Sequence, residues 1–419
     1  MLRQEEGSKA VADAVARCRP EVISAYPISP QTHIVEHLSD MVREGEISPC
    51  EYLMVESEFA AMSACIGASA TGARTYTATA SQGLLYMVEA LYNASGLGLP
   101  IVMTLANRAI GAPINIWNDH SDSMSQRDSG WIQLFAETNQ EAADLHVQAF
   151  RLAEQISLPV MVCMDGFILT HAYEEVDVPS QEAVDEFLPP LEPRQVLDPA
   201  EPVTIGAMVG PEAFTEVRYL MHAKQLEALD LIPPIASEFE SSFGRPSGGL
   251  VRGYRTDDAE TVVVALGSVL GTIEEVVDEL RDRGVKIGAL AIKCFRPWPS
   301  QEIRAALSNV ERVIVLEKAF AVGAGGIVGQ NTRLALYGSG VKIHVVIAGL
   351  GGRPITRRSL RTLFDDVLAD RLDPHLLHFL DLKSDVVERE LERTRGGGRV
   401  GPHAENIVRE LGIVAARPY

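Results

Sequence analysis

The chain has 419 residues, of which 46% are hydrophobic and 22% are charged, so it is long and apolar enough for about two or three packed domains. Its 37 basic and 57 acidic residues give a formal net charge of −20, which argues against nucleic acid or an anionic membrane as a partner. The sequence has no signal-peptide pattern and no apolar run of membrane-spanning length, so we expect a cytoplasmic protein.

The first half of the chain alternates short apolar strands with helical segments. Apolar runs predict strands over 22–24, 52–55, 75–79, 101–105 and 160–164. The helical spacing of apolar residues predicts helices over 7–19, 32–42, 58–70, 81–93 and 141–156. This alternation is typical of a parallel sheet covered by helices on both faces, which places the chain in the α/β class.

The second half begins with two irregular stretches. Residues 179–202 are rich in proline and acidic side chains and predict a surface connector, and residues 232–255 are expected to be similarly loose. A second α/β unit follows, with strands predicted over 261–266, 285–291, 312–316 and 342–347 and helices over 271–283 and 326–336. We therefore expect one domain over 1–235 and another over 236–383.

The tail over 384–419 changes in character. Its segment 393–401 is rich in glycine and arginine and predicts a flexible linker. A short helix predicted over 404–411 follows the linker, and we expect this helix to dock on another surface.

Five cysteines, Cys18, Cys50, Cys65, Cys163 and Cys294, are scattered singly along the chain. None lies in a Cys-x-x-Cys pair, so the sequence has no local signature for a zinc or iron–sulfur site, and we predict no metal site. Dispersed cysteines predict reduced thiols that pack as small apolar side chains. If the protein takes part in a redox reaction, the electron carriers must lie on another polypeptide.

The most informative segment is Ala25-Tyr26-Pro27-Ile28-Ser29-Pro30, at the end of the first predicted strand. Its two prolines restrict the backbone, so they predict a stiff loop that presents Ser29 at the sheet edge where α/β proteins bind ligands. A simple turn would also explain the prolines. The functional interpretation depends on three later segments: Glu56-Ser57-Glu58, Thr79-Ala80-Ser81-Gln82-Gly83 and Asn107-Arg108-Ala109.

Taken in this order, the segments resemble the alpha subunit of the 2-oxoacid:ferredoxin (acceptor) oxidoreductase family, and the resemblance covers most of the chain. It implies a parallel-sheet domain that binds the pyrimidine of thiamine diphosphate, followed by a domain similar to the transketolase carboxyl-terminal domain. It also implies oxidative decarboxylation of a 2-oxoacid to acyl-CoA and CO2, with thiamine diphosphate as cofactor and coenzyme A as co-substrate. Such a chain is active only in a complex.

The resemblance also implies roles for single residues. Glu58 takes the place of the acid that hydrogen-bonds the pyrimidine N1′, and its structural alternative is a helix-start glutamate favoured by the helix dipole. Arg108 and Ser29 would hold the substrate carboxylate, since a forked guanidinium fits a carboxylate well, and the structural alternative for Arg108 is a surface ion pair. The other candidates for cofactor binding are Pro27, Ile28, Ser81 and Gln82.

Missing motifs imply partner chains. The sequence lacks the Gly-Asp-Gly loop that holds magnesium and the diphosphate, and it lacks coenzyme A-binding and ferredoxin-like segments. The resemblance therefore implies a beta subunit that supplies the Mg²⁺ and diphosphate site, together with gamma and ferredoxin-like delta subunits. Iron–sulfur clusters would lie on these other subunits only, and we expect a dimer of heteromeric protomers.

The substrate is less narrowly defined. Pyruvate is expected first, followed by aryl or branched-chain 2-oxoacids such as phenylglyoxylate or 2-oxoisovalerate. Ser29 stands where the family usually has threonine, which gives the pocket a little more room. Four large side chains in or beside the loop after Arg108 could widen an apolar pocket or simply pack: Ile116, Trp117, Met124 and Trp131.

Other motifs and other functions stay open at this point. The cluster Asn118-Asp119-His120-Ser121-Asp122 suggests a metal site, but a structural role near the active site is the preferred interpretation. The glycine-rich segment 349–352 and Arg296-Pro297-Trp298-Pro299 are interpreted as turns. The alternative functions are a subunit of a transketolase- or 2-oxoacid-dehydrogenase-type thiamine enzyme, and a non-catalytic assembly scaffold of the same fold.

Overall fold

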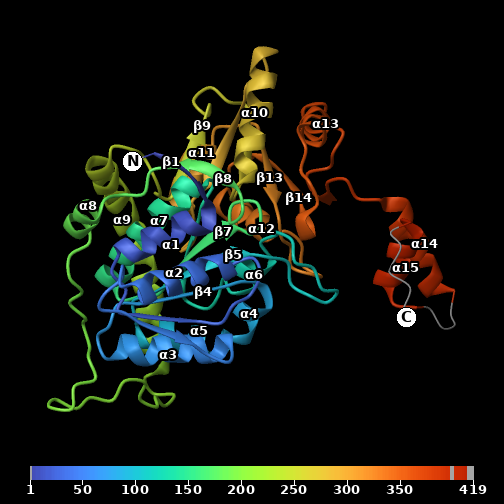
Figure 1. Cartoon of the computed structure of the whole chain (residues 1–419). Coiled ribbons are helices and arrows are strands. Elements are labelled where there is room, and N and C mark those ends of the chain that lie inside the picture. The colour runs from blue at the N-terminus through green and yellow to red at the C-terminus, as the bar shows by residue number, and fades with distance from the viewer. Residues whose placement is uncertain (1, 397–400, 413–419) are drawn as a thin grey trace.

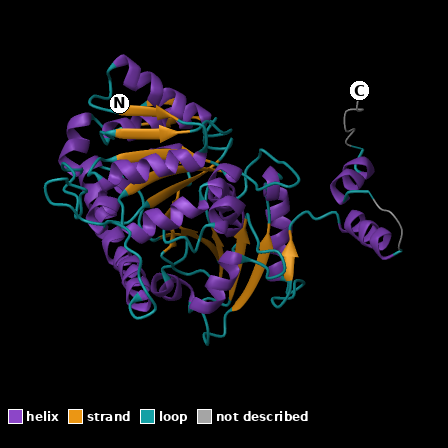
Figure 2. Ribbon diagram, turned by 90° about the horizontal axis from the view of Figure 1, so that it is seen from below, coloured by secondary structure: helices purple, strands orange, loops and turns teal. Residues whose placement is uncertain are grey.

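The structure is a computed structural model that describes residues 2–396 and 401–412. Two α/β units lie against each other, and a pair of helices near the carboxyl terminus projects away from both (Figure 1). Figure 2 shows the strands of both sheets flanked by helices. Part of the linker predicted over 393–401 falls outside the described residues.

Among the described residues, seven strands form the first sheet, in the order β12-β6-β7-β5-β4-β2-β3. Neighbouring strands are parallel except β12 and β6, which are antiparallel. The carboxyl ends of β2, β4 and β5 therefore meet at one edge, where open α/β sheets bind ligands. The bounds are β2 (Val22–Ala25), β3 (Glu51–Met54), β4 (Thr75–Thr79), β5 (Ile101–Asn107), β6 (Ile132–Phe135), β7 (Val160–Asp165) and β12 (Cys294–Arg296).

Helices cover both faces of this sheet because successive strand residues point to opposite sides. Val160 and Val162 of β7 belong to the core beneath α1, α2 and α7, whereas Met161 and Cys163 belong to the core shared with α3, α4 and α5. The bounds are α1 (Gly7–Arg17), α2 (Thr32–Glu44), α3 (Glu58–Ala70), α4 (Ser81–Tyr86), α5 (Val88–Leu97) and α7 (Asn139–Ile156).

The second sheet, within the described residues, has six strands in the order β15-β14-β13-β10-β11-β9 and is parallel except for β9. Its strands are β9 (Val251–Tyr254), β10 (Thr261–Ala265), β11 (Ile287–Ile292), β13 (Arg312–Glu317), β14 (Lys342–Ile347) and β15 (Leu377–Phe379). Its helices are α10 (Val269–Asp282), α11 (Ser300–Leu307), α12 (Ile327–Ala335) and α13 (Arg357–Leu368).

The two units share one apolar core. One face of the second sheet packs with α10 and α13, and its other face belongs to the same core as α3, α4 and α5. Only Lys293 separates β11 from β12, so the chain passes directly from the second sheet into the first. The first sheet and the loops at its edge are therefore held by the second unit.

The expectation that residues 232–255 are loose is wrong for its first part. α9 (Phe214–Phe243) runs through this segment as one helix, with Pro233 and Pro234 inside it. Phe239 is fully buried in the core of the first unit. Burial of this apolar face outweighs the tendency of the two prolines to break a helix.

Several short elements were not predicted. β1 (Arg3–Glu6) pairs antiparallel with β8 (Tyr173–Val176), and the helix predicted over 81–93 is divided at Met87. A helix also interrupts the connector predicted over 179–202. The remaining elements are α6 (Ser121–Ser125), α8 (Gln181–Phe187), η1 (Leu350–Gly352), α14 (Ser384–Arg395) and α15 (His403–Glu410).

α14 and α15 form the projecting pair near the carboxyl terminus (Figure 1). The Glu390 carboxylate joins them, because its Oε1 contacts His403 Nδ1 at 2.7 Å and accepts a hydrogen bond from Asn406 Nδ2 at 2.8 Å. That this pair docks on another surface stays a prediction. None of the described helices combines the length and the apolar character needed to cross a membrane.

Candidate active site

The proline loop, residues 26–30, lies between β2 and α2 and is held in place by the side chain of Gln31. The side chain of Gln31 is buried, and its Nε2 donates hydrogen bonds to Tyr26 O at 2.9 Å and to Ala78 O at 3.0 Å. Pro27 and Ser29 are exposed on the outer side of the loop, and Ile28 is half-buried. The loop is thus fixed to β4 while Ser29 stays accessible, and Gln31 is a positioning residue that the sequence interpretation missed.

Arg108 follows β5 directly and lies beside the proline loop. Its Nη1 donates to Ser29 O at 2.9 Å, and its Nε donates to Asn115 O at 3.1 Å. Only 6% of the residue is exposed, and this burial lowers the pKa of the guanidinium, an effect that Asp122 opposes. Nη2 has no hydrogen-bond partner among the described residues, so it can still donate to an anion.

Glu58 is the first residue of α3, and Ser57 caps this helix by accepting a hydrogen bond from Ala60 N. Glu58 is 7% exposed, and within the described part of the chain its carboxyl group has no hydrogen-bond partner. It lies against Gly83, where a Cβ would come within 2.6 Å of Glu58 Oε1 and would also meet Thr79 Oγ1. The buried carboxyl and the 79–83 segment therefore face each other.

The 79–83 segment also contacts the loop after β5. Ser81 is buried, its backbone is left-handed with φ of 47°, and its Oγ donates to the Ala109 carbonyl and to Gln82 Oε1. A Cβ on Gly111 would lie 2.7 Å from Gln82 Nε2. The structure thus places Ser81 and Gln82 between the segment of Glu58 and that of Arg108.

Asp122 is the buried centre of this arrangement, and the sequence interpretation gave it no role of its own. One carboxylate oxygen accepts hydrogen bonds from Ser81 N at 3.0 Å and from Arg108 N at 2.9 Å. The other accepts from Asn107 Nδ2 and Ser123 N, both at 2.8 Å. Burial raises the pKa of Asp122 to about 7 despite these hydrogen bonds. Its place in the acidic cluster 118–122 was the signal that pointed to it.

Residues of the second unit hold the same loop through Asp165, at the end of β7. Its carboxylate contacts His120 Nε2 at 2.7 Å and Lys318 Nζ at 3.0 Å, and it accepts from Ser268 N at 3.1 Å. Burial alone would raise the pKa of Asp165, but Lys318 and His120 hold it well below its usual range. Lys318 also donates to the side chain of Asn118.

The glycine-rich turn of the second unit makes a further contact with this loop. Gly351 N donates to Asp119 Oδ2 at 3.0 Å, and Asn115 Nδ2 donates to Gly351 O at 3.2 Å. Because Asn115 O holds Arg108, the turn supports the guanidinium through one intermediate residue. The 349–352 turn therefore holds the loop through Asn115 and through Asp119 of the cluster 118–122.

The four large side chains near this loop divide into two pairs. Met124 and Trp131 are fully buried, and Trp131 Nε1 donates to Leu91 O at 3.0 Å, so both are packing residues. Ile116 and Trp117 are 41% and 54% exposed. Only the second pair can face a ligand or a partner chain.

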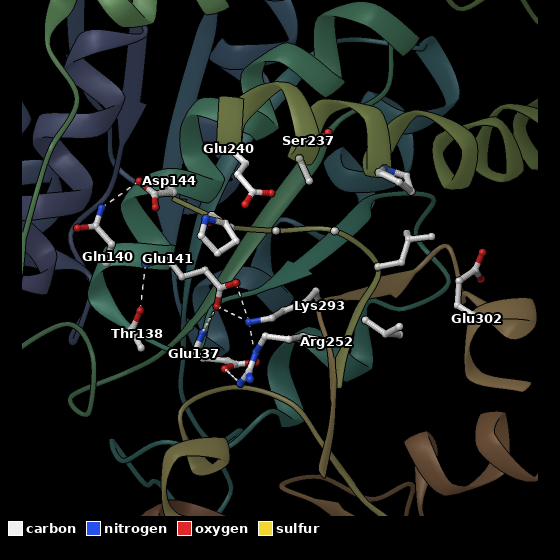
Figure 3. A pocket seen from close by; sticks show the side chains of 18 residues that line it. Glu137, Thr138, Gln140, Glu141, Asp144, Ser237, Glu240, Arg252, Lys293 and Glu302 are labelled. Atoms are coloured by element: carbon white, nitrogen blue, oxygen red, sulfur yellow. Dashed lines mark hydrogen bonds and ion pairs between the residues drawn. The ribbon is translucent and has the colours of Figure 1, made fainter. Parts of the chain in front are cut away.

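A cavity of about 610 Å³ lies elsewhere, and none of the predicted site residues lines it (Figure 3). Buried Lys293 points into it between Glu137 and Glu141, with Nζ 2.6 Å from an oxygen of each. Arg252 also pairs with Glu137 at 2.6 Å. Because Lys293 and Arg252 neutralise the carboxylates of Glu137 and Glu141, we interpret the cavity as part of the interface between the two units.

Comparison with known proteins follows the same division of the chain. The pyruvate flavodoxin/ferredoxin oxidoreductase, thiamine diphosphate-binding family model matches residues 13–233. This chain belongs to the pyruvate flavodoxin/ferredoxin oxidoreductase family. The pyruvate:ferredoxin oxidoreductase core domain II model matches residues 259–360. The family assignment and the fold class predicted from the sequence are both confirmed.

Relatives in this oxidoreductase family match nearly end to end. Pyruvate synthase subunit PorA of Methanosarcina barkeri is 50% identical over 389 residues, which cover 91% of this chain and 97% of that protein. PorA of Methanocaldococcus jannaschii is 48% identical over 86% of this chain and 93% of that protein. Ketoisovalerate oxidoreductase subunit VorA of Pyrococcus horikoshii is 42% identical over 86% of this chain and 92% of that protein.

A solved structure shows the same fold. The 2-oxoglutarate:ferredoxin oxidoreductase from Magnetococcus marinus, with 2-oxoglutarate, coenzyme A and succinyl-CoA bound, aligns with a TM-score of 0.68 at 20% identity. The alignment covers 87% of this chain and 65% of that chain. Both units of this family member therefore follow an architecture known in a larger oxidoreductase chain.

Proposed function

We propose that this chain is the alpha subunit of a pyruvate:ferredoxin oxidoreductase, which converts pyruvate and coenzyme A to acetyl-CoA and CO2 and passes electrons to iron–sulfur clusters on other subunits. The observation that carries the proposal is the meeting of Ser29, Arg108 and Glu58 at one sheet edge. The chain has this arrangement together with 50% identity to a pyruvate synthase subunit.

The substrate carboxylate is assigned to Arg108 and Ser29. Arg108 is a buried cation whose Nη2 has no partner in the described part of the chain, and it lies within hydrogen-bond distance of the Ser29 backbone. A hydrogen bond from the charged Nη2 and one from the uncharged Ser29 hydroxyl would orient a 2-oxoacid with its ketone facing inward. The bonds from Arg108 to Ser29 O and Asn115 O keep the guanidinium from rotating away.

The residues around Glu58 fit the pyrimidine end of thiamine diphosphate. The Glu58 carboxyl is buried without a partner among the described residues, so it is available to share a proton with a ring nitrogen. Because Gly83 has no Cβ, the side chains of Glu58 and Thr79 can approach its backbone closely. When bound, thiamine diphosphate supplies the nucleophilic carbon and the electron sink for decarboxylation. Glu58, Ser81 and Gln82 hold and orient the ring from this side.

A partner must complete this site, because the sequence has no magnesium–diphosphate loop. Large apolar side chains are exposed around Glu58, namely Leu53, Met54, Phe59 and Tyr86. Phe59 and Tyr86 lie with their rings 6.5 Å apart. An exposed apolar surface beside an incomplete site fits a thiamine-diphosphate-binding beta subunit that covers it. Gamma and ferredoxin-like delta subunits, in a dimer of such protomers, would complete the enzyme.

A branched-chain 2-oxoacid is the second candidate substrate. It is favoured by the 42% identity to a ketoisovalerate oxidoreductase subunit and by serine at position 29, which is smaller than the threonine usual in the family. The assay is reduction of a viologen dye by the assembled complex with coenzyme A and pyruvate, 2-oxoisovalerate, phenylglyoxylate or 2-oxoglutarate. We expect the highest kcat/KM with pyruvate. A tenfold preference for 2-oxoisovalerate would favour the second candidate, and no turnover with any of the four would favour a scaffold.

A further inference from the structure

Three potential metal ligands meet on the first unit, and none of them is among the residues assigned above. Glu6 ends β1, His33 lies in the first turn of α2, and His171 precedes β8. One ligand atom from each of the three side chains lies within 4.8 Å of the others. These residues are far apart in the sequence, so no spacing motif marks them.

The backbone holds two of these ligands in a fixed relation. Gly7 N donates to Ala172 O at 3.0 Å, and Ser8 N donates to Thr170 O at 2.9 Å. Glu6 is also in register with Tyr173 across the antiparallel β1–β8 pair. Glu6 and His171 are therefore positioned by hydrogen bonds on either side of them, as a preorganised metal site requires.

His33 completes the group from α2. Its ring stacks on that of His171, with centroids 4.7 Å apart and planes 29° apart, and its Nδ1 lies 2.7 Å from Glu6 Oε1. Ligands that are about 2.1 Å from a tetrahedral zinc ion lie roughly 3.4 Å from one another. The 2.7 Å between His33 Nδ1 and Glu6 Oε1 and the 4.8 Å limit on all three ligand atoms lie on either side of this spacing.

The environment of His171 suits a ligand. Its Nδ1 lies 2.7 Å from Thr170 Oγ1, which leaves Nε2 for a metal, and such partners commonly orient ligating histidines. Burial, and then the neighbouring His33, lower the pKa of His171, while Glu6 opposes this.

We propose that Glu6, His33 and His171 bind one divalent first-row transition metal, with zinc as the best match, and that a fourth position is open to water. Two imidazoles and one carboxylate form a donor set that zinc uses with a solvent ligand. The metal would join β1 to α2, and the loop that precedes α2 carries Ser29. Without a metal, the same residues would form only a stacked histidine pair with one ion pair.

The test uses the full chain without a histidine tag, stripped with EDTA and titrated with Zn²⁺ by calorimetry and with Co²⁺ by visible absorption. We expect one Zn²⁺ per chain and the strong absorption of tetrahedral Co²⁺. His33→Ala and His171→Ala should each weaken Zn²⁺ binding at least tenfold. His37→Ala is the control, because it lies one turn further along α2 and has Asp13 as its neighbour at 3.8 Å.

Glu6→Gln tests the carboxylate separately and should lose the tetrahedral Co²⁺ signal. If a variant does not fold alone, the zinc content of the assembled complex, measured by mass spectrometry, gives the same comparison for the exposed His33→Ala. Zn²⁺ should also raise the Tm of the wild-type chain but not that of His33→Ala. No stoichiometric Zn²⁺, octahedral Co²⁺ only, or equal binding by His33→Ala and His37→Ala would overturn the proposal.

Discussion

The guanidinium of Arg108 contacts the backbone of the proline loop and leaves Nη2 available for an anion. Arg108→Ala removes a charge-assisted contact, typically about 1.5–3 kcal/mol, and should lower kcat/KM for the 2-oxoacid by about 10- to 150-fold. Ser29→Ala removes a hydrogen bond from an uncharged donor to the same carboxylate. At about 1.5 kcal/mol, the lower end for hydrogen bonds to charged groups, its loss should lower kcat/KM by about 13-fold.

Steady-state kinetics on the assembled complex measures both effects, and the KM for coenzyme A is the internal control. The double variant should lose less than the product of the two single effects, since both groups serve one carboxylate and neighbouring sites couple. Strictly multiplicative losses, or a change in the KM for coenzyme A alone, would contradict the shared assignment.

Burial distinguishes the two acids of the Glu-Ser-Glu segment. Glu58 is buried against Gly83, whereas Glu56 is exposed. Glu58→Gln should lower kcat by about 10²- to 10⁴-fold, the usual range for a lost acid–base group, while the complex stays assembled. Glu56→Gln is the matched control and should change kcat less than about threefold. Steady-state kinetics measures kcat for both variants, and gel filtration checks that each complex is assembled. A larger loss of kcat in Glu56→Gln than in Glu58→Gln would assign the role to Glu56.

Asp122 makes stability depend on pH in a defined direction. Its folded pKa of about 7 lies above the ordinary value of 3.8, so the folded chain holds more protons between these values. The free energy of unfolding therefore falls as pH rises through that window, by up to about 1.4 kcal/mol per pH unit, and levels off above it. Asp122→Asn lacks this contribution. Urea unfolding measured at several pH values from 5 to 7.5 should therefore show that the free energy of unfolding falls less steeply with pH in Asp122→Asn than in the wild-type chain. The same pH dependence of the unfolding free energy in the wild-type chain and in Asp122→Asn would contradict the prediction.

At the scale of elements, α9 shows how packing overrides a local signal. Two prolines indicate a break, yet the helix continues and buries Phe239. Phe239→Ala should lower the free energy of unfolding by about 3–5 kcal/mol, as for other buried phenylalanines. Leu226→Ala, on an exposed part of the same helix, should change it by less than about 0.5 kcal/mol. Urea unfolding measures the free energy of unfolding of both variants. If the segment were loose, Phe239→Ala and Leu226→Ala would change it equally little.

At the scale of the whole molecule, the proposed site needs a second chain. This chain carries Glu58 and Arg108, but its sequence has no loop for magnesium and diphosphate. The isolated chain should therefore be inactive and bind thiamine diphosphate weakly, with little response to Mg²⁺, whereas the assembled complex should bind it tightly. Calorimetry with and without Mg²⁺ measures this. Tight, magnesium-dependent binding by the isolated chain would show that the site is complete without a partner.

The sequence by itself determined the α/β class and the segments that carry Ser29, Glu58 and Arg108. These features are local, because apolar periodicity marks strands and helices, and parallel strands necessarily bring their carboxyl ends to one edge. The family resemblance depended on the same local segments and was confirmed.

Only the tertiary structure decided how these segments are joined. Asp122 links Ser81 to Arg108, Lys318 reaches Asp165 from the second sheet, and Glu6, His33 and His171 meet from three separate elements. Each link connects residues that are distant in the sequence, and its existence depends on burial and on the packing of whole elements. No local pattern carries that information, because the free energy of these contacts arises only after the sheets and helices have come together.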